Sequence, residues 1–354
     1  MEGSDITFVR FKETPYGGAE RYLNRLKESL TRRGLAVETL HADLPGWLPS
    51  WLKVLLFSRR VCRRFSHALA DSRPVLFSLD RITCPDIYRA GDGVHRAYLN
   101  TKGFTLNPLH LSYLWLERRT FANARAIIAN SRMVREQILQ YYPQVTPEKI
   151  HVVYNGLPLP DPVDKAAAKA ALAREMGFDP NLPVLLFVGS GFARKGVREF
   201  LTILSRLGHD YTAFVVGKEK RLTRYRRRAE ELGISDKVTF TGPRKEVERF
   251  YAAADLFLFP TRYEPFSNVV LEALSYGDVV FTTRQNGAAE ILEDRYVMER
   301  PDAPETARKI DRLLADPERL RQEQKKARKL SERFSIERNV AETLKVLDKI
   351  QKNS

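Results

Sequence analysis

A repeated alternation of short apolar runs with segments of helical periodicity limits the possible folds more than any other feature of this sequence. Each run is short enough for a buried strand and leads through a turn into a helical segment. Examples are residues 6–11, 74–80, 183–188 and 255–259. Strands that alternate with helices form parallel sheets covered by helices, and 354 residues suffice for two such domains. We therefore expect an α/β protein with two doubly wound lobes, residues 1–160 and 161–335.

Residues 261–274 are the most informative stretch, with the sequence Thr-Arg-Tyr-Glu-Pro-Phe-Ser-Asn-Val-Val-Leu-Glu-Ala-Leu. They follow an apolar run that ends at Pro260 and is predicted to be a strand. They lead through a turn into a helical segment that should end at Gly277, so the predicted order is strand, turn, helix. Ser267 or Asn268 is expected to cap this helix. The first backbone N–H groups of the helix and its dipole would then form a site for an anion such as a diphosphate.

Two carboxylates flank this predicted anion site, Glu264 in the turn and Glu272 in the helix. A carboxylate repels a phosphate, but it can accept hydrogen bonds from the hydroxyl groups of a sugar or a ribose. That combination is the chemistry of nucleotide-sugar recognition. An isolated pair at this spacing is ordinarily two solvated residues. The strand, the proline and the helix start between the glutamates favour the functional interpretation here.

Residues 264–273 resemble the E-x7-E element of retaining glycosyltransferases of family 4, which have the GT-B fold with two Rossmann-like lobes. The resemblance extends over nearly the whole chain. It implies that residues 1–160 bind the acceptor, that residues 161–335 bind a nucleotide-sugar, and that a last helix at about 336–352 packs back on the first lobe. The residues that it places at the donor are Gly17, Gly18, Ser190, Arg194, Lys195, Arg244, Phe266, Ser267, Asn268, Val269 and Glu272. The residues that it implies in catalysis are Asp92, Arg194, Lys195 and Glu264.

Arg194 and Lys195 follow the strand at 183–188 and a turn that contains glycine. This turn lacks both the P-loop pattern and G-x-G-x-x-G, which argues against a P-loop nucleotidase and a nicotinamide site. Cations at a helix start oppose the helix dipole, so a functional reason for them is favoured. The resemblance implies that they neutralise the leaving diphosphate. Because the sequence contains no Asp-x-Asp pair and no His or Cys pair at metal-ligand spacing, we expect neither a metal nor another cofactor.

Asp92 and His95 are candidates for contacting the acceptor, because loops that follow strands of a parallel sheet reach the ligand crevice. An Asp beside Gly is more often a turn residue, and only the resemblance favours a functional acid here. Residues 84–96 and 97–124 are similar to those of enzymes that add glucose to the heptose region of lipopolysaccharide core. This narrower resemblance implies transfer of a hexose, such as glucose, from a UDP-sugar to that core or a similar membrane-borne glycan. The alternative is the same fold acting on another lipid, a polysaccharide or a small sugar as acceptor.

The formal net charge of +15 favours phosphate-bearing partners, namely nucleic acid, an anionic membrane or a phosphorylated glycolipid. No nucleic-acid motif is recognisable, so we do not expect nucleic acid as a partner. A basic nucleic-acid-binding protein is the distant alternative. The basic excess is concentrated in residues 1–160, which suits an anionic acceptor. Residues 46–64, which contain two tryptophans and five basic residues, predict either a basic amphipathic helix on an anionic bilayer or a buried helix with a solvated end. Residues 97–124, expected as one aromatic and basic helix, leave the same two interpretations open.

The two cysteines, Cys62 and Cys84, are too few for a disulfide framework or a zinc site, so we expect packing residues in a reducing cytoplasm. The first strand begins at about residue 6, which leaves no room for a signal peptide. No apolar run reaches the roughly 20 residues that a membrane span requires. The sequence therefore predicts a cytoplasmic protein, peripheral to the inner face of the inner membrane.

Overall fold

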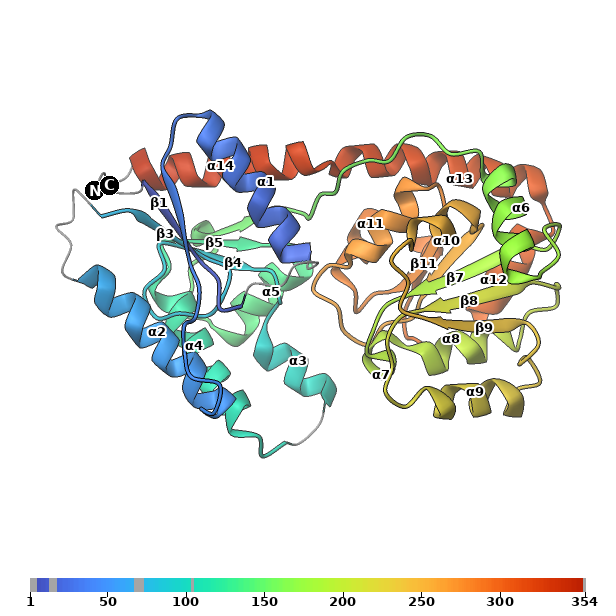
Figure 1. Ribbon diagram of the computed structural model, residues 1–354, viewed down its shortest axis with the longest axis horizontal. Helices are drawn as coiled ribbons and strands as arrows, with labels where there is room; N and C mark the ends of the chain where they lie inside the picture. Colours follow the sequence, from blue (N-terminus) through green and yellow to red (C-terminus); the bar gives the residue numbers. More distant parts are fainter. Residues whose placement is uncertain (1–4, 13–17, 67–72, 103–104, 353–354) are drawn as a thin grey trace. The chain divides into compact units, whose positions relative to one another are not determined.

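The computed structural model describes residues 5–12, 18–66, 73–102 and 105–352 (Figure 1). The chain divides into two compact units, which we call unit 1 (residues 1–155 and 336–354) and unit 2 (residues 156–335). Each unit contains a six-stranded sheet, and every pair of neighbouring strands is parallel. The predicted α/β class with two doubly wound sheets is confirmed. The assignment of acceptor binding to one lobe and donor binding to the other stays a prediction.

The sheet of unit 1 has the strand order β2-β1-β3-β4-β5-β6. Its strands are β1 (Ile6–Val9), β2 (Val37–Leu40), β3 (Val75–Ser78), β4 (Ile87–Ala90), β5 (Ala126–Ala129) and β6 (Ile150–Val152). Its helices are α1 (Gly18–Arg32), α2 (Ser50–Ser66), α3 (His95–Lys102), α4 (Pro108–Asn123), α5 (Arg132–Tyr141), the 3-10 turn η2 (Pro147–Lys149) and α14 (Ile336–Lys352).

The last helix, α14, packs on α1 and on the sheet of unit 1. Its apolar residues Leu344 and Leu347 join Phe8 and Leu26 in one buried cluster. The hydroxyl groups of Tyr22 on α1 and Thr343 on α14 lie 3.2 Å apart inside this packing. Residues more than three hundred positions apart in the sequence therefore pack in the same hydrophobic core.

The sheet of unit 2 has the order β12-β11-β10-β7-β8-β9. Its strands are β7 (Val184–Val188), β8 (Thr212–Val216), β9 (Val238–Gly242), β10 (Leu256–Phe259), β11 (Val279–Thr283) and β12 (Val297–Met298). Its α-helices are α6 (Lys165–Met176), α7 (Phe192–Lys195), α8 (Val197–Leu204), α9 (Leu222–Glu231), α10 (Glu248–Ala253), α11 (Asn268–Ser275), α12 (Glu305–Leu314) and α13 (Pro317–Ser331). Its 3-10 turns are η3 (Gly287–Ile291), η4 (Asp294–Tyr296) and η5 (Glu332–Phe334).

The order of strands in unit 2 reverses between β7 and β10. From β7 the chain adds β8 and β9 on one side, then returns to place β10, β11 and β12 on the other. In an open parallel sheet, ligands bind outside the carboxyl ends of the strands at such a reversal, because the connections there leave in opposite directions. The segments that follow β7 and β10 are therefore the ones that the topology brings to a ligand. Unit 1 has the equivalent reversal between β1 and β3.

The strand β4 was not predicted, because the segment before Asp92 and His95 was expected to be part of the loop that follows the strand at 74–80. Ile87, Tyr88 and Ala90 are buried in β4, and Arg89 lies between them. The arginine broke the apolar pattern that identifies a buried strand. It is accommodated because its Nη2 donates to Asn155 Oδ1 at 2.7 Å and its guanidinium lies 4.1 Å from the centre of the Tyr22 ring.

Residues 97–124 also differ from the prediction, since they contribute to two helices, α3 and α4, and not to one. Pro108 occupies the first turn of α4, where proline is tolerated, and Asn107 caps that helix by accepting a hydrogen bond from the Leu109 N–H. Helix α4 buries Leu116 and Phe121, whereas Trp115 is 52% exposed. One side of this helix is therefore core, and contact of its other side with a membrane stays a prediction.

Helix α2 divides its surface in the same way. Phe57, Val61 and Phe65 are buried, whereas Trp51 near its start is exposed. Trp47, which precedes the helix, is 81% exposed. Of the two interpretations of residues 46–64, the buried helix therefore holds for one face of α2. Within the ranges that the structure describes, no helix combines the length and the apolarity needed to cross a bilayer.

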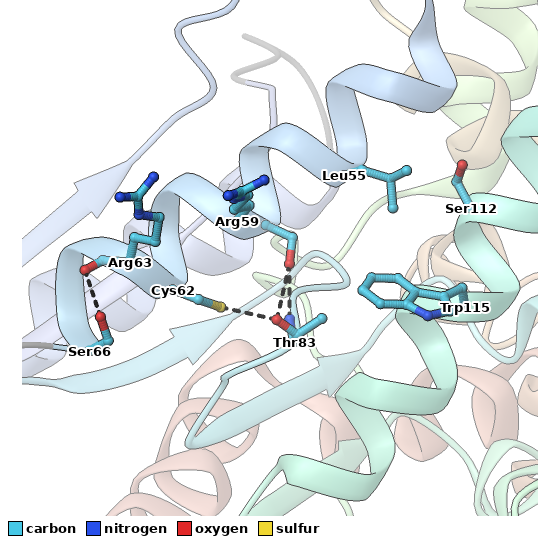
Figure 2. Close-up of a pocket in the computed structure, with 9 residues that line it drawn as sticks. Leu55, Arg59, Cys62, Arg63, Ser66, Thr83, Ser112 and Trp115 are labelled. Atoms are coloured by element: carbon cyan, nitrogen blue, oxygen red, sulfur yellow. Dashed lines mark hydrogen bonds between the residues drawn. The ribbon is translucent and has the colours of Figure 1, made fainter.

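The cysteines contradict the expectation of two reduced packing residues. Cys62 on α2 and Cys84 after β3 form a disulfide. The Cys62 sulfur also lies 3.3 Å from the Thr83 hydroxyl (Figure 2). Their spacing of 22 residues gave no indication of this pairing, because it depends on how α2 packs over the end of β3. The disulfide does not support the inference of a reducing compartment.

Candidate functional site

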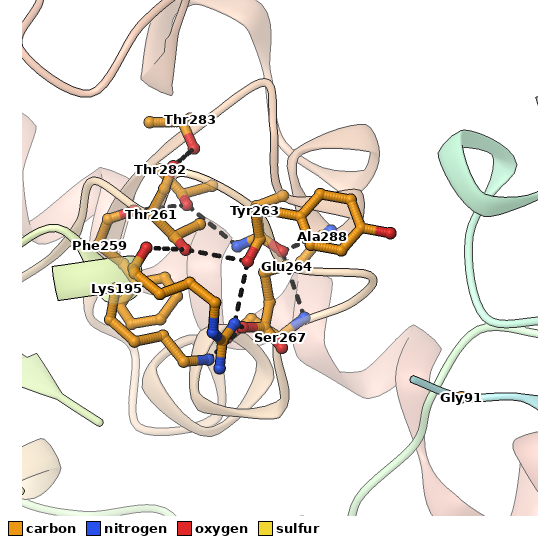
Figure 3. Close-up of polar contacts among 12 residues, drawn as sticks. Gly91, Lys195, Phe259, Thr261, Tyr263, Glu264, Ser267, Thr282, Thr283 and Ala288 are labelled. Atoms are coloured by element: carbon orange, nitrogen blue, oxygen red, sulfur yellow. Dashed lines mark hydrogen bonds and ion pairs between the residues drawn. The ribbon is translucent and has the colours of Figure 1, made fainter. Parts of the chain in front are cut away.

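The segments that follow β7 and β10 bring three predicted residues together at the reversal of unit 2 (Figure 3). Oε2 of Glu264 accepts hydrogen bonds from Lys195 Nζ and, at 2.6 Å, from Arg194 Nη1. Arg194 Nη1 also donates to the Tyr263 carbonyl oxygen at 3.0 Å. The Lys195 ammonium lies 5.1 Å from the centre of the Phe259 ring, within the range of a cation–π contact. We call Arg194, Lys195 and Glu264 the charged triad.

Burial and mutual attraction act in opposite directions on the charged triad. Burial lowers the pKa of Lys195, and the neighbouring Glu264 carboxylate partly offsets that effect. Burial also raises the pKa of Glu264, but Lys195 and Arg194 outweigh it, so this pKa is lowered overall. Glu264 is therefore ionised at neutral pH. Two cations and one anion leave an excess positive charge at this site.

Arg194 and Lys195 end the one-turn helix α7 and directly precede Gly196, the N-cap of helix α8. The predicted order of strand, glycine loop and helix is therefore present, and the two cations stand immediately before the start of α8. Ion pairs with Glu264 and backbone contacts with the neighbouring segment hold both residues there.

Two hydrogen bonds tie the segment after β7 to the segment after β10. The Arg194 carbonyl oxygen accepts from the Arg262 N–H at 2.9 Å and from the Thr261 hydroxyl at 3.2 Å. A further ion pair joins Arg262 Nη2 to Glu199 Oε1 at 2.5 Å. The charged triad is consequently held by backbone positions as well as by its own side chains.

Gly196 permits this close approach. It adopts a left-handed φ of +83°, and a Cβ there would lie 1.9 Å from the Pro260 carbonyl oxygen. Gly191 offers a matched comparison in the same segment, with a φ of +76°. No described atom lies within 4 Å of a Cβ built at Gly191, so only the backbone conformation restricts it.

We expect Gly196→Ala to destabilise unit 2 by about 2–4 kcal/mol, because left-handed strain and a backbone clash add together. Gly191→Ala should cost only about 1–2 kcal/mol, from the strain alone. Chemical denaturation monitored by circular dichroism measures both variants. Equal losses of stability in the two variants would show that the contact with Pro260 does not restrict residue 196.

Asn286 organises the far side of the site, a role that the sequence interpretation did not assign. Its Oδ1 accepts from the Ser267 N–H at 3.2 Å and the Ala288 N–H at 3.1 Å, and its Nδ2 donates to Thr282 Oγ1 at 3.0 Å. The Glu264 backbone lies alongside it, with the Glu264 N–H donating to the Gln285 carbonyl at 3.0 Å. The sequence signal was an Asn-Gly pair that follows the buried strand β11 after Arg284 and Gln285.

The start of α11 differs in detail from the predicted anion site. Ser267 occupies the N-cap position, but its side chain makes no capping hydrogen bond, and its N–H is already donated to Asn286. Further along the helix, Glu272 Oε2 accepts from the Tyr251 hydroxyl at 3.0 Å. Burial, together with Glu272, raises the pKa of Tyr251, so this tyrosine remains a neutral donor. Ribose binding by Glu272 stays a prediction.

The remaining predicted donor residues occupy different environments. The Ser190 hydroxyl accepts from the Lys218 N–H at 3.0 Å, and Arg244 is exposed between β9 and α10. Phe266 is buried, whereas Asn268 and Val269 are half-buried at the start of α11. Gly17 lies outside the described residues, and Gly18 is the first residue of α1. Their contacts with a donor stay predictions.

Asp92 and His95 belong to unit 1, where they follow β4. Asp92 is exposed. Burial, followed by the charge of Arg81, lowers the pKa of His95 to about 3, so this imidazole is neutral at physiological pH. His95 Nε2 lies 3.0 Å from His110 Nδ1. Acceptor contact by either residue stays a prediction.

A fully buried carboxylate, Glu117 on α4, supports the backbone next to Asp92. It accepts from Arg81 Nε at 2.9 Å and from the backbone N–H groups of His95 and Arg96 at 2.7 and 3.3 Å. Tyr142 donates its hydroxyl to the same carboxylate at 2.7 Å. Arg81 in turn donates to the Gly93 carbonyl at 3.0 Å. Sequence reasoning missed this network because its members are distant in the chain.

Asp80 occupies the reversal of unit 1 and was also missed. Its Oδ2 accepts from the Phe11 N–H at 2.7 Å, which joins the segment after β3 to the segment after β1. Among the described residues, no group of three or more His, Cys, Asp or Glu side chains could hold a metal ion. Arg194 and Lys195 place positive charge at the reversal of the unit 2 sheet.

Comparison with known families gives two matches that together span most of the chain. The family described as Glycosyltransferase Family 4 matches residues 16–159, and the family described as Glycosyl transferases group 1 matches residues 169–330. Both matches concern glycosyltransferases.

Individual relatives extend this comparison. The lipopolysaccharide glucosyltransferase WaaG of Escherichia coli K12 is 26% identical over 82% of this chain and 83% of its own length. A crystal structure of WaaG has a TM-score of 0.76 at 23% identity, covering 92% of this chain and 95% of that one. Anabaena HepE in complex with UDP and glucose has a TM-score of 0.73 at 20% identity, covering 98% and 100% of the two chains. The D-inositol 3-phosphate glycosyltransferase of Segniliparus rotundus is 29% identical over 86% of this chain and 78% of its own length.

Proposed function

Because this chain belongs to the family 4 (group 1) glycosyltransferases, which are retaining, nucleotide-sugar-dependent enzymes of GT-B fold, we propose a specific reaction for it. In this reaction it moves a hexose, namely glucose, from a UDP-sugar to a lipopolysaccharide core heptose or a similar membrane-borne glycan. The observation that carries this proposal is the charged triad at the reversal of the unit 2 sheet. It offers excess positive charge where the topology brings a ligand. The likeness to WaaG, which spans both lobes, supports the choice of acceptor.

The charged triad would act on the leaving group. Departure of UDP from the sugar carbon develops negative charge on the diphosphate, and preorganised cations stabilise such charge without having to reorganise. Lys195 and Arg194 are preorganised by Glu264, which holds both of them in place. A bound diphosphate would add a second anion beside Lys195 and oppose the lowering of its pKa by burial.

The other roles follow from the proposed reaction. The acceptor hydroxyl would approach the same face of the sugar from which UDP departs, and its proton would pass to a phosphate oxygen. Asp92 would orient the acceptor. Glu264 would hold hydroxyl groups of the transferred sugar through its second oxygen, Glu272 would contact the ribose, and the segment at Arg244 would lie beside the base.

We place the enzyme at the inner face of the inner membrane, where it would bind peripherally. Exposed Trp47, Trp115 and Leu106 in unit 1 support this location, because aromatic and apolar side chains beside basic residues favour the interface of an anionic bilayer. A second acceptor class is favoured by the 29% identity to the D-inositol 3-phosphate glycosyltransferase over 86% of this chain. A phosphorylated small sugar or polyol is therefore the alternative acceptor.

A donor and acceptor panel tests the proposal. Purified protein is incubated with UDP-glucose, UDP-galactose, UDP-N-acetylglucosamine or GDP-mannose, and with heptose-terminated lipopolysaccharide or inositol 3-phosphate. We expect UDP-glucose with the lipopolysaccharide to give the fastest transfer and an α-linked product by NMR. Because Arg194 and Lys195 supply the positive charge, EDTA should leave the rate within about twofold.

Two results would contradict parts of this proposal separately. Transfer only to inositol 3-phosphate would exclude the lipopolysaccharide acceptor and leave the donor assignment intact. Loss of turnover with EDTA, restored by a divalent cation, would exclude the metal-independent role of the charged triad.

A further inference from the structure

Helices α2 and α4 of unit 1, together with the segment after β3, line a pocket of about 540 Å³ (Figure 2). Its volume falls within the roughly 300–1,000 Å³ typical of sites for small molecules. Leu55 and Cys62 of α2 face Trp115 of α4, and Thr83 from the segment after β3 contributes between them. The disulfide from Cys62 to Cys84 ties α2 to this segment and so fixes one wall of the pocket.

The hydroxyl groups that line the pocket are engaged within the protein. The Ser58 hydroxyl accepts from the Thr83 N–H at 3.0 Å, and the Thr83 hydroxyl contacts both Ser58 and the Cys62 sulfur. The Ser112 hydroxyl donates to the Pro108 carbonyl at 3.3 Å, and the Ser66 hydroxyl donates to the Arg63 carbonyl at 3.0 Å. Because these groups already have partners, the wall favours a hydrocarbon over a ligand with many hydroxyl groups.

Two exposed arginines, Arg59 and Arg63, stand at the pocket one helical turn apart on α2. Among the described residues, neither guanidinium has an ion-pair or hydrogen-bond partner. Arg60 and Arg64, which lie next to them on α2, have partners outside the pocket. Arg60 Nη1 donates to the Asp43 carbonyl at 2.7 Å, and Arg64 Nη2 pairs with Glu38 at 3.0 Å.

The surroundings of the pocket are apolar at its α4 side. Trp115 is 52% exposed and Leu111, one turn before it, is 69% exposed. Helix α2 contains no acidic residue. An apolar pocket beside exposed tryptophan and unpaired arginine is complementary to a molecule with a hydrocarbon chain and a negatively charged group.

We propose that this pocket binds one acyl chain of an anionic phospholipid, with the phosphate paired to Arg59 and Arg63. The inference rests on the membrane location in the proposed function and adds a specific lipid site to it. A lipid held in this way would anchor unit 1 through a defined cavity, in addition to the exposed aromatic side chains. None of the pocket residues belongs to the proposed transfer machinery.

Photocrosslinking tests the hydrocarbon part of the site. The full-length protein is mixed with phosphatidylcholine vesicles that contain phosphatidylglycerol bearing a diazirine near the end of one acyl chain. After irradiation, we expect label on peptides that contain Leu55, Cys62 or Trp115. Ser112→Phe should fill the pocket and reduce this label at least tenfold, whereas Leu111→Phe, on the exposed face, should not. Circular dichroism verifies that both variants fold.

Vesicle sedimentation tests the charged part. Arg59→Gln/Arg63→Gln should weaken binding to vesicles with phosphatidylglycerol by about tenfold or more. Arg60→Gln/Arg64→Gln removes the same two charges outside the pocket and should weaken binding by less than about threefold. Equal losses in the two double variants, or label confined to Trp47 and Leu106, would overturn the pocket site.

Transfer from UDP-glucose to detergent-dispersed acceptor separates the two proposals. If the pocket variants keep wild-type transfer but the wild-type protein shows no pocket label, the lipid site is wrong and the proposed function stands. If the pocket is labelled but no donor and acceptor combination gives transfer, the proposed function is wrong and the lipid site stands.

Discussion

Lys195→Ala is expected to lower kcat by about 10²–10³-fold while KM for the sugar nucleotide changes only a few-fold. The ammonium is half-enclosed beside Phe259 and Glu264, so its charge acts in a partly desolvated environment. A cation that stabilises the departing diphosphate contributes more in the transition state than in the ground state, and its loss therefore appears in kcat. Steady-state kinetics with UDP-glucose as the varied substrate measures both parameters.

Lys220→Ala is the matched control for this prediction. Lys220 is an exposed lysine of the same unit, so its removal changes the net charge equally without touching the triad. Its kinetic parameters should remain within about twofold of wild type. Thermal denaturation must accompany both variants, because Lys195 is also a partner of the half-buried Glu264. An intact kcat with a raised KM in Lys195→Ala would show that this residue contributes to ground-state binding only.

The prediction of the charged triad shows what sequence can provide. A strand, a turn and a helix start around Glu264, and a second strand and turn before Arg194, identified the two segments. Parallel sheets bring such segments to one edge, so their neighbourhood follows from topology. The pairing itself did not follow. Glu264 was expected to face a sugar, whereas its Oε2 binds both cations, a side-chain detail that topology does not determine.

The strand β4 and the disulfide were missed for a common physical reason. Arg89 is stabilised in a buried strand by Tyr22 and Asn155, which come from α1 and the end of unit 1. Cys62 meets Cys84 because α2 packs across the end of β3. In both cases the deciding partner is distant in the chain, and local periodicity carries no information about it.

Glu117→Ala should show the largest loss of stability in unit 1, about 3–5 kcal/mol, because it leaves the buried Arg81 guanidinium without its counterion. The same carboxylate accepts from the His95 and Arg96 backbone N–H groups and from Tyr142, so these donors also lose a partner. Hydrogen exchange of the amides around residues 93–96, together with urea denaturation followed by circular dichroism, measures the effect.

A pair of controls distinguishes a buried charge network from a general effect of removing a glutamate. Glu28→Ala removes an exposed carboxylate that lies 3.6 Å from Arg25, and it should cost less than about 0.5 kcal/mol. Arg81→Met/Glu117→Leu replaces both buried charges with apolar groups and should recover much of the loss, because the penalty comes from an unpaired charge in a dry environment. If Glu117→Ala were no more destabilising than Glu28→Ala, the network would not support the backbone beside Asp92. A double variant as unstable as the single one would instead assign the cost to the lost backbone and Tyr142 hydrogen bonds, since these are absent from both proteins.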